Sequence, residues 1–280
     1  MQEAAGSSTI RVATLNLWGR QGAWDERRAV LVEGLHRLRP DVIAFQDVIK
    51  SEGYDQVTDL LGAGYQVAHQ SNRAADGSGV SIASRWEVED VRELDLRLTS
   101  RAAGLPYAAL VAQVLAPEPL GPLLVVNQRT AFPFGGEHER ELQAVGTARF
   151  VEELIGERKV VSHVVLAGDF NAAPGSASVR FWRGLQSLGE TSVCYQDSWE
   201  SAHLGEPGHT FSPRNPLVAG GEMPLELGRR IDYVMVRCVE HGPTLAVTAC
   251  ELIFEEPVDE VWASDHFGVV ADFSAQTHGE

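Results

Sequence analysis

The chain has 280 residues, 44% of them hydrophobic, which is enough to form a large buried core within one domain. Its formal net charge of −16 at pH 7 disfavours stable nucleic-acid binding, because proteins that hold duplex DNA need a basic surface that displaces counterions. No apolar stretch approaches the roughly 18 residues of a membrane span, so we expect no transmembrane segment.

In chain order, the hydrophobic pattern predicts a loose tail at 1–8, a strand at 10–17, a helix at 26–38, a strand at 41–45 and a helix at 52–61. Strands follow at 65–69, 79–84, 88–98, 108–115 and 123–127. A long amphipathic helix at 137–155, a strand at 160–166, a short helix at 176–185 and a Gly- and Pro-rich loop at 205–230 come next. Strands at 231–236 and 269–273 precede a tail at 275–280.

Strands outnumber helices in this pattern, and several follow one another directly, which favours hairpins. We therefore predict one α/β domain over residues 9–274, built as a sandwich of mixed, mostly antiparallel sheets rather than as a doubly wound parallel sheet.

The cysteines and the N-terminus bear on the cellular compartment. Cys194, Cys238 and Cys250 show no CxxC spacing, which indicates free thiols in a reducing environment. Residues 1–10 lack the basic segment and the apolar run of a secretion signal. We expect a cytoplasmic protein, and a monomer.

Polar side chains end or interrupt the predicted apolar strands repeatedly. They are Asn16, Asp47, Arg129, Asp169, Asn171, Asp232, Asp265 and His266. A buried acid without a partner is costly, so such acids are paired, hydrogen-bonded or bound to metal. Clusters of Asp and Asn oxygens suit Mg²⁺ or Mn²⁺, and an Asp beside a His can orient and charge the imidazole.

Each of these residues also has an ordinary structural interpretation. Asp169 could cap a turn before Pro174, Asp232 could pair with Arg230, and the Asp265–His266 dipeptide could cap a helix or a turn. Their joint occurrence at strand ends favours a functional site.

Five segments carry a resemblance to a known family. They are RVATLN at 11–16, DVIAFQD at 41–47, GDFN at 168–171, RIDY at 230–233 and SDH at 264–266. In this order and at these separations the chain resembles the endonuclease/exonuclease/phosphatase (DNase I-like) superfamily over residues 9–274. The resemblance implies a four-layered α/β sandwich, in which two mixed β-sheets are flanked by helices.

The resemblance also implies a metal site. Asp47 and Asp265, with Asn16 close by, would bind the divalent cation, Mg²⁺ or Mn²⁺.

The catalytic roles follow from the same motifs. Asp169 would accept a proton from the attacking water, and Asn171 would orient that water or bind a phosphate oxygen. Asp232 would hydrogen-bond His266, and the charged His266 would contact the substrate and stabilise the negative transition state.

Two positions depart from the family pattern. Asp47 stands where the family usually has Glu, and it reaches about one methylene less far. Arg129 stands where the family has a histidine that assists the leaving group, yet a guanidinium cannot give up a proton at ordinary pH. We predict that Arg129 points into the site and contacts a substrate phosphate oxygen. The alternative is that it pairs with the acids and blocks the site.

Two loops are further candidates. Residues 209–216 resemble a segment that lies near the phosphate in some family members, and there we predict that Asn215 contacts substrate; the alternative is a surface loop fixed by proline. Residues 130–136 could form a substrate lid, or Phe132 and Phe134 could simply pack against the sandwich.

The sequence thus predicts a divalent-metal-dependent hydrolase of phosphate esters that acts on a small phosphorylated molecule, a lipid headgroup or a nucleotide. One alternative is a catalytically altered phosphate-binding or regulatory protein on the same fold, because of Arg129 and Asp47. A true nuclease is a further alternative, which the acidic charge disfavours.

Overall fold

A computed structural model describes residues 9–158 and 163–275, and in it two β-sheets stack face to face. The six-stranded sheet has the order β12-β13-β1-β2-β4-β3. Its strands are β1 (Thr9–Asn16), β2 (Val42–Ile49), β3 (Gln66–His69), β4 (Ser78–Ser84), β12 (Leu245–Ile253) and β13 (Gly268–Ala275). The predicted tail at 1–8, and residues 276–280 of the other tail, lie outside the described residues.

The second sheet has seven strands, in the order β11-β10-β8-β7-β6-β5, and β9 also pairs with β10. Its strands are β5 (Val88–Asp95), β6 (Ala108–Leu115), β7 (Pro122–Arg129), β8 (His163–Asp169), β9 (Tyr195–Asp197), β10 (Asp232–Val239) and β11 (Gly242–Pro243). Only β1–β2 and β7–β8 pair in parallel among the described strands. This confirms the prediction of mixed, mostly antiparallel sheets.

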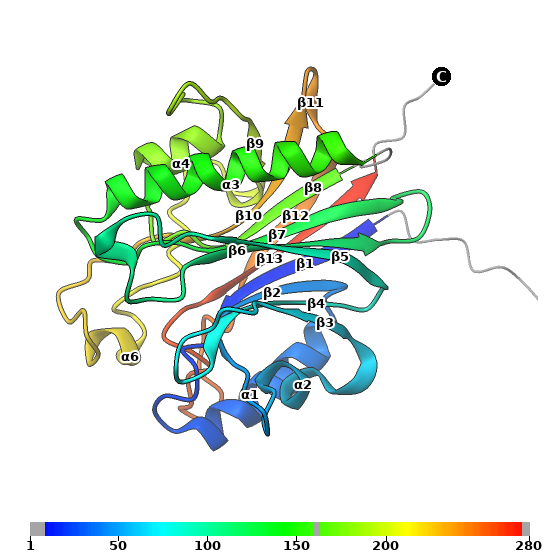
Figure 1. The fold of residues 1–280 in the computed structure, drawn as a ribbon. Coiled ribbons are helices and arrows are strands. Elements are labelled where there is room, and N and C mark those ends of the chain that lie inside the picture. The colour runs from blue at the N-terminus through cyan, green and yellow to red at the C-terminus, as the bar shows by residue number, and fades with distance from the viewer. Residues whose placement is uncertain (1–8, 159–162, 276–280) are drawn as a thin grey trace, which may run out of the picture.

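Helices cover the two outer faces of the sandwich, so that the fold has four layers (Figure 1). On the six-stranded sheet lie α1 (Trp24–Leu38) and α2 (Gln56–Leu61), and on the seven-stranded sheet lie α3 (Glu137–Glu157) and α4 (Ala177–Trp182). The shorter helices are α5 (Ser198–Ala202) and α6 (Pro216–Ala219), with 3₁₀ turns at Gly62–Gly64 and Ser100–Ala102. No described helix is both long and apolar enough to cross a bilayer.

Three apolar layers hold the sandwich together. Val12, Val125 and Val165 belong to the layer between the two sheets. The other two layers lie between a sheet and the helices that cover it. One of them includes Leu31 and Leu35, which lie one helical turn apart on α1. Alternate side chains of one strand point to opposite faces, so the central strands supply two layers at once and read as nearly continuous apolar runs.

Several element predictions need correction. The predicted loop 205–230 contains α6, and the strands β9, β11 and β12 and the helix α5 were not predicted. The strand β12 is an edge strand with a register shift between Val247 and Ala249, so its apolar residues do not alternate regularly. Residues 163–166 of the predicted strand 160–166 belong to β8. Residues 160–162 lie outside the described part of the chain.

Candidate active site

The candidate site lies at one rim of the sandwich, where strands from both sheets begin or end. Antiparallel pairing of β8 with β10 sets Asp169 opposite Asp232, and parallel pairing of β7 with β8 sets Arg129 beside Asp169. In the other sheet, Asn16 ends β1, and His266 lies two residues before the start of β13. The strand register thus brings together residues that are up to 250 positions apart, the difference between 266 and 16.

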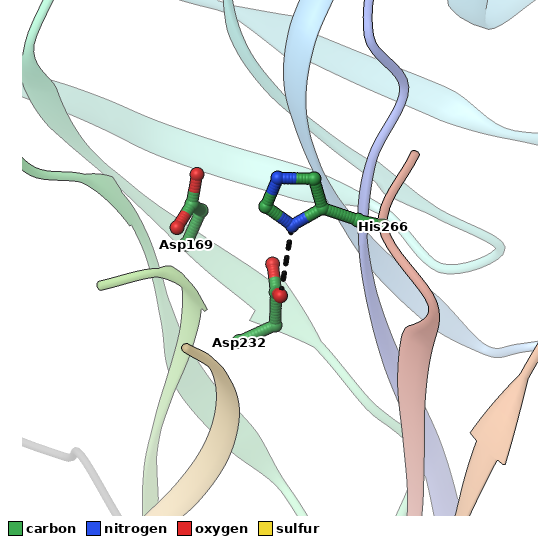
Figure 2. Close-up of side chains that lie close together, drawn as sticks. All are labelled: Asp169, Asp232 and His266. Atoms are coloured by element: carbon green, nitrogen blue, oxygen red, sulfur yellow. Dashed lines mark hydrogen bonds and ion pairs between the residues drawn. The ribbon is translucent and has the colours of Figure 1, made fainter. Parts of the chain in front are cut away.

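Asp169, Asp232 and His266 form the buried centre of the site. One ligand-type atom of each lies within 4.8 Å of the others. His266 Nδ1 hydrogen-bonds Asp232 Oδ2 at 2.9 Å, and the Asp169 carboxylate lies beside the imidazole ring (Figure 2). Asp232 Oδ1 is buried and has no hydrogen-bond partner among the described residues.

Opposing effects set the charges of this centre. Burial lowers the pKa of His266, but the charge and hydrogen bond of Asp232, with Asp265 and Asp169, raise it to about 10. Burial and the charge of Asp232 raise the pKa of Asp169 to about 6, although His266 opposes them. At neutral pH the centre therefore holds an imidazolium beside an ionised carboxylate that is basic for its type.

Two asparagines hold Asp169 in place. Asn16 Nδ2 donates to Asp169 Oδ2 at 3.1 Å and to Asp47 Oδ2 at 3.0 Å. The Asn171 backbone N–H donates to Asp169 Oδ1 at 3.0 Å, and its Nδ2 donates to the Thr130 carbonyl at 3.0 Å. Asn171 takes a φ of 49°, which Asn tolerates better than most residues. Its predicted contact with water or phosphate stays a prediction.

Arg129 lies among the residues of the candidate site, where it pairs with an acid. Its Nη2 lies 3.0 Å from Asp47 Oδ1, its side chain is 12% exposed, and its guanidinium lies 5.8 Å from the centre of the Tyr107 ring. Among the described residues, its buried Nε has no acceptor. The ion pair is the contact that the alternative interpretation of Arg129 expects, and the contact with a phosphate stays a prediction.

The predicted cation ligands provide oxygen donors that suit Mg²⁺ or Mn²⁺. Burial raises the pKa of Asp265; His266 opposes this shift, and the negative charge of Asp47 adds to it. Such repulsion between carboxylates is relieved when a cation binds between them. Asn16 is a weaker candidate, because its Oδ1 accepts the Trp18 N–H at 2.9 Å.

Three supporting residues were not singled out from the sequence, although they lie within the segments 209–216 and 264–266. Thr210 Oγ1 accepts the backbone N–H groups of Ile231 and Asp232 at 3.0 and 3.1 Å. The Phe211 ring lies 4.9 Å from the His266 ring. Ser264 Oγ donates to the Asn16 carbonyl at 2.7 Å, which ties the SDH segment to the end of β1.

Asn215 has a structural role, and its side chain is not exposed to solvent. Its side chain is fully buried, its Oδ1 caps α6 by accepting the Leu217 N–H at 3.0 Å, and its Nδ2 donates to the Ser264 carbonyl at 2.7 Å. The predicted substrate contact therefore has no support from these hydrogen bonds. The residue connects α6 to the segment that precedes Asp265 and His266.

The loop 130–136 shares features of both interpretations offered for it. Phe132 packs against a buried cluster that contains Tyr107, as a packing role requires. Phe134 is 64% exposed and lies 4.5 Å from the Arg229 guanidinium, measured to the ring centre. Arg140 Nη1 donates to the carbonyls of Ala131 and Pro133, both at 2.9 Å, and so ties the loop to α3.

The four-layered sandwich, with an Asp–His pair and a second Asp at its strand ends, fits the family that the sequence motifs resemble. The comparison with family models agrees with that resemblance. The chain belongs to the endonuclease/exonuclease/phosphatase family, whose model matches residues 13–266.

Curated relatives include sphingomyelin phosphodiesterase 2 of Homo sapiens, 24% identical over 257 residues, which cover 83% of this chain and 57% of that protein. The Rattus norvegicus protein of the same name is 24% identical over 289 residues, which cover 95% of this chain and 64% of that protein. The chain thus spans 57% and 64% of the length of these relatives.

Solved structures share the fold. The structure of D. rerio TDP2 complexed with single strand DNA product has a TM-score of 0.74 at 21% identity, with 96% of this chain and 100% of that chain covered. The human nocturnin catalytic domain with bound sulfate has a TM-score of 0.72 at 18% identity, with 96% and 95% covered. At these identities the likeness concerns the fold alone.

Proposed function

We propose that this protein is a divalent-metal-dependent phosphodiesterase. The observation that supports this most is the buried Asp169–Asp232–His266 centre, in which a charged imidazole lies beside an acid whose pKa is raised to about 6. A phosphodiester hydrolase needs a base for water and a positive group for the developing negative charge, and this centre offers both.

Each residue of the centre has one task in the proposed reaction. Asp169, ionised at neutral pH, accepts the proton of the attacking water. Asp232 holds Nδ1 of His266, which leaves the opposite ring nitrogen to donate a hydrogen bond to a phosphate oxygen. Asp47 and Asp265 would hold a divalent cation, Mg²⁺ or Mn²⁺, which supplies further positive charge for the phosphate.

Arg129 restricts the leaving group. A guanidinium stabilises negative charge but stays protonated at ordinary pH, so it gives no proton to a departing alkoxide. We therefore expect the best substrates to have leaving groups that depart without protonation. Two curated relatives carry the name sphingomyelin phosphodiesterase 2, which supports a phospholipid headgroup or a similar small phosphodiester as the substrate class.

The substitution Asp169→Asn tests the proposal. We expect the rate of hydrolysis of bis(p-nitrophenyl) phosphate with Mg²⁺ to fall by about 10²- to 10⁴-fold, because the amide cannot act as a base. The matched control is Asp259→Asn at an exposed position with a φ of 47°, which Asn also tolerates. Near-normal turnover by Asp169→Asn would show that another group activates the water.

A second candidate function follows from the Arg129–Asp47 ion pair. It engages a carboxylate that the metal would need, so the protein could bind phosphate ligands without hydrolysing them. If the wild-type protein binds inorganic phosphate but cleaves none of a panel of phosphomonoesters and phosphodiesters with Mg²⁺ or Mn²⁺, this second function holds and the first fails.

A further inference from the structure

Both oxygens of the Asp47 carboxylate are engaged by side-chain donors. Oδ1 lies 3.0 Å from Arg129 Nη2, and Oδ2 accepts Asn16 Nδ2 at 3.0 Å. The backbone fixes this arrangement, since Asp47 has a φ of 49° and lies in a register shift between Phe45 and Val48 of β2. A divalent cation that binds Asp47 must therefore share carboxylate oxygens that already accept these donors.

The guanidinium of Arg129 is only partly satisfied. Its one ion pair among the described residues is with Asp47, and its Nε is buried without an acceptor. Buried polar groups are usually hydrogen-bonded, and a guanidinium has five donors that fit a planar or tetrahedral oxyanion. Arg129 can thus take up a second oxyanion at the site.

Asp47 has one cationic partner among the described residues, the guanidinium of Arg129, whose Nη2 lies 3.0 Å from Asp47 Oδ1. Asp265, the other predicted cation ligand, is a second carboxylate. A cation held by Asp47 and Asp265 would neutralise the carboxylate, and the attraction that holds Arg129 would weaken accordingly. Metal and guanidinium are then competitors for one carboxylate.

We propose that Arg129 is an internal counter-cation of Asp47, that a divalent cation displaces it, and that the freed guanidinium binds the substrate phosphate. This inference rests on the proposed function, because it uses the same cation and phosphate positions. It predicts that metal and phosphate promote each other's binding, since each is bound better by the state in which Arg129 has left Asp47.

The first test measures metal affinity without phosphate, by calorimetric titration of Mn²⁺ into the whole chain. Arg129→Met removes the competitor, and we expect it to bind Mn²⁺ more tightly than wild type by roughly 5-fold or more. Arg129→Lys keeps a cation and should stay closer to wild type. Arg237→Met is the matched control, because it removes the same charge from an ion pair with Glu152. Unchanged or weaker Mn²⁺ binding by folded Arg129→Met would overturn the inference.

The second test measures coupling, by titrating inorganic phosphate with and without Mg²⁺. Wild type should bind phosphate more tightly when Mg²⁺ is present, and Arg129→Met should lose most of this enhancement while Arg237→Met keeps it. Equal enhancement in wild type and Arg129→Met would contradict the inference. These binding measurements are independent of turnover, so a protein that shows the coupling without hydrolysis would refute the proposed function and leave the inference standing.

Discussion

Among individual side chains, Asp232 sets both the orientation and the charge of His266. It hydrogen-bonds Nδ1 at 2.9 Å, and its charge raises the pKa of an imidazole that burial alone would leave neutral. The buried Oδ1 of Asp232 has no partner among the described residues, so the imidazole is its main compensation. Because burying two charged groups is costly, we expect the charged imidazole to be used in the reaction.

Asp232→Asn should therefore lower kcat by about 10²- to 10⁴-fold while changing KM less, because the amide holds the ring but no longer favours its charged form. Steady-state kinetics on bis(p-nitrophenyl) phosphate with saturating Mg²⁺ measure both constants. A variant with unchanged kcat would show that the charge on His266 is not used in the reaction.

Most residues of the site could be predicted from the sequence, because each follows or interrupts an apolar strand. The alternative interpretation of Arg129 expects an ion pair with one of the acids, but the sequence could not select Asp47, because that choice depends on how two strands of different sheets stack. The role of Asn215 could not be predicted either, because its partner Ser264 lies 49 positions further along the chain.

Among the elements, the short helix α6 shows how a loop segment supports the site. Asn215 begins the helix as its N-cap, Pro216 takes the first turn, where a missing N–H costs nothing, and Val218 packs with Phe211 and Ile231. The Gly and Pro content that predicts a loop for residues 205–230 conceals this four-residue helix, because so short an element has no periodic pattern.

Asn215→Ala should destabilise the protein by about 1–3 kcal/mol, because it removes a cap and leaves the buried Ser264 carbonyl without its donor. Urea denaturation with an unchanged m-value would measure this loss. We also expect kcat/KM to fall, since Ser264 directly precedes Asp265 and His266. Wild-type stability would show that α6 is held by its other contacts.

The central strands of both sheets were predicted from the sequence, whereas the edge strand β12 was not. The central strands β1, β7 and β8 are buried and read as apolar runs, whereas β12 at an edge has only a few buried residues. Only Leu245 and Cys250 of its nine residues are buried although seven of the nine are apolar, so its apolar residues do not mark one buried face.

Across the molecule, a buried polar link joins the two sheets behind the site. Gln46 Nε2 donates to Asn127 Oδ1 at 2.7 Å, and Asn127 Nδ2 donates to the carbonyls of Phe45 and Ser81, both at 2.9 Å. Asn127 is two positions before Arg129 on β7, and Gln46 directly precedes Asp47 on β2. The link therefore fixes the distance between the two strands that carry the ion pair.

Asn127→Ala should cost about 2–5 kcal/mol of unfolding free energy, because it leaves a cavity and removes the partners of several buried polar groups. Chemical denaturation gives the value. A loss below 1 kcal/mol would indicate that water or a rearranged Gln46 replaces the link.

The central claim is that this rim of the sandwich hydrolyses phosphodiesters with a divalent cation. The most direct measurement is the initial rate of bis(p-nitrophenyl) phosphate cleavage by the wild-type chain with excess EDTA, and again after Mg²⁺ or Mn²⁺ is restored in excess. We expect the rate to fall to the background of the uncatalysed reaction with EDTA and to recover when the metal is restored. A rate above background that EDTA leaves unchanged, or no cleavage with either metal, would contradict the account.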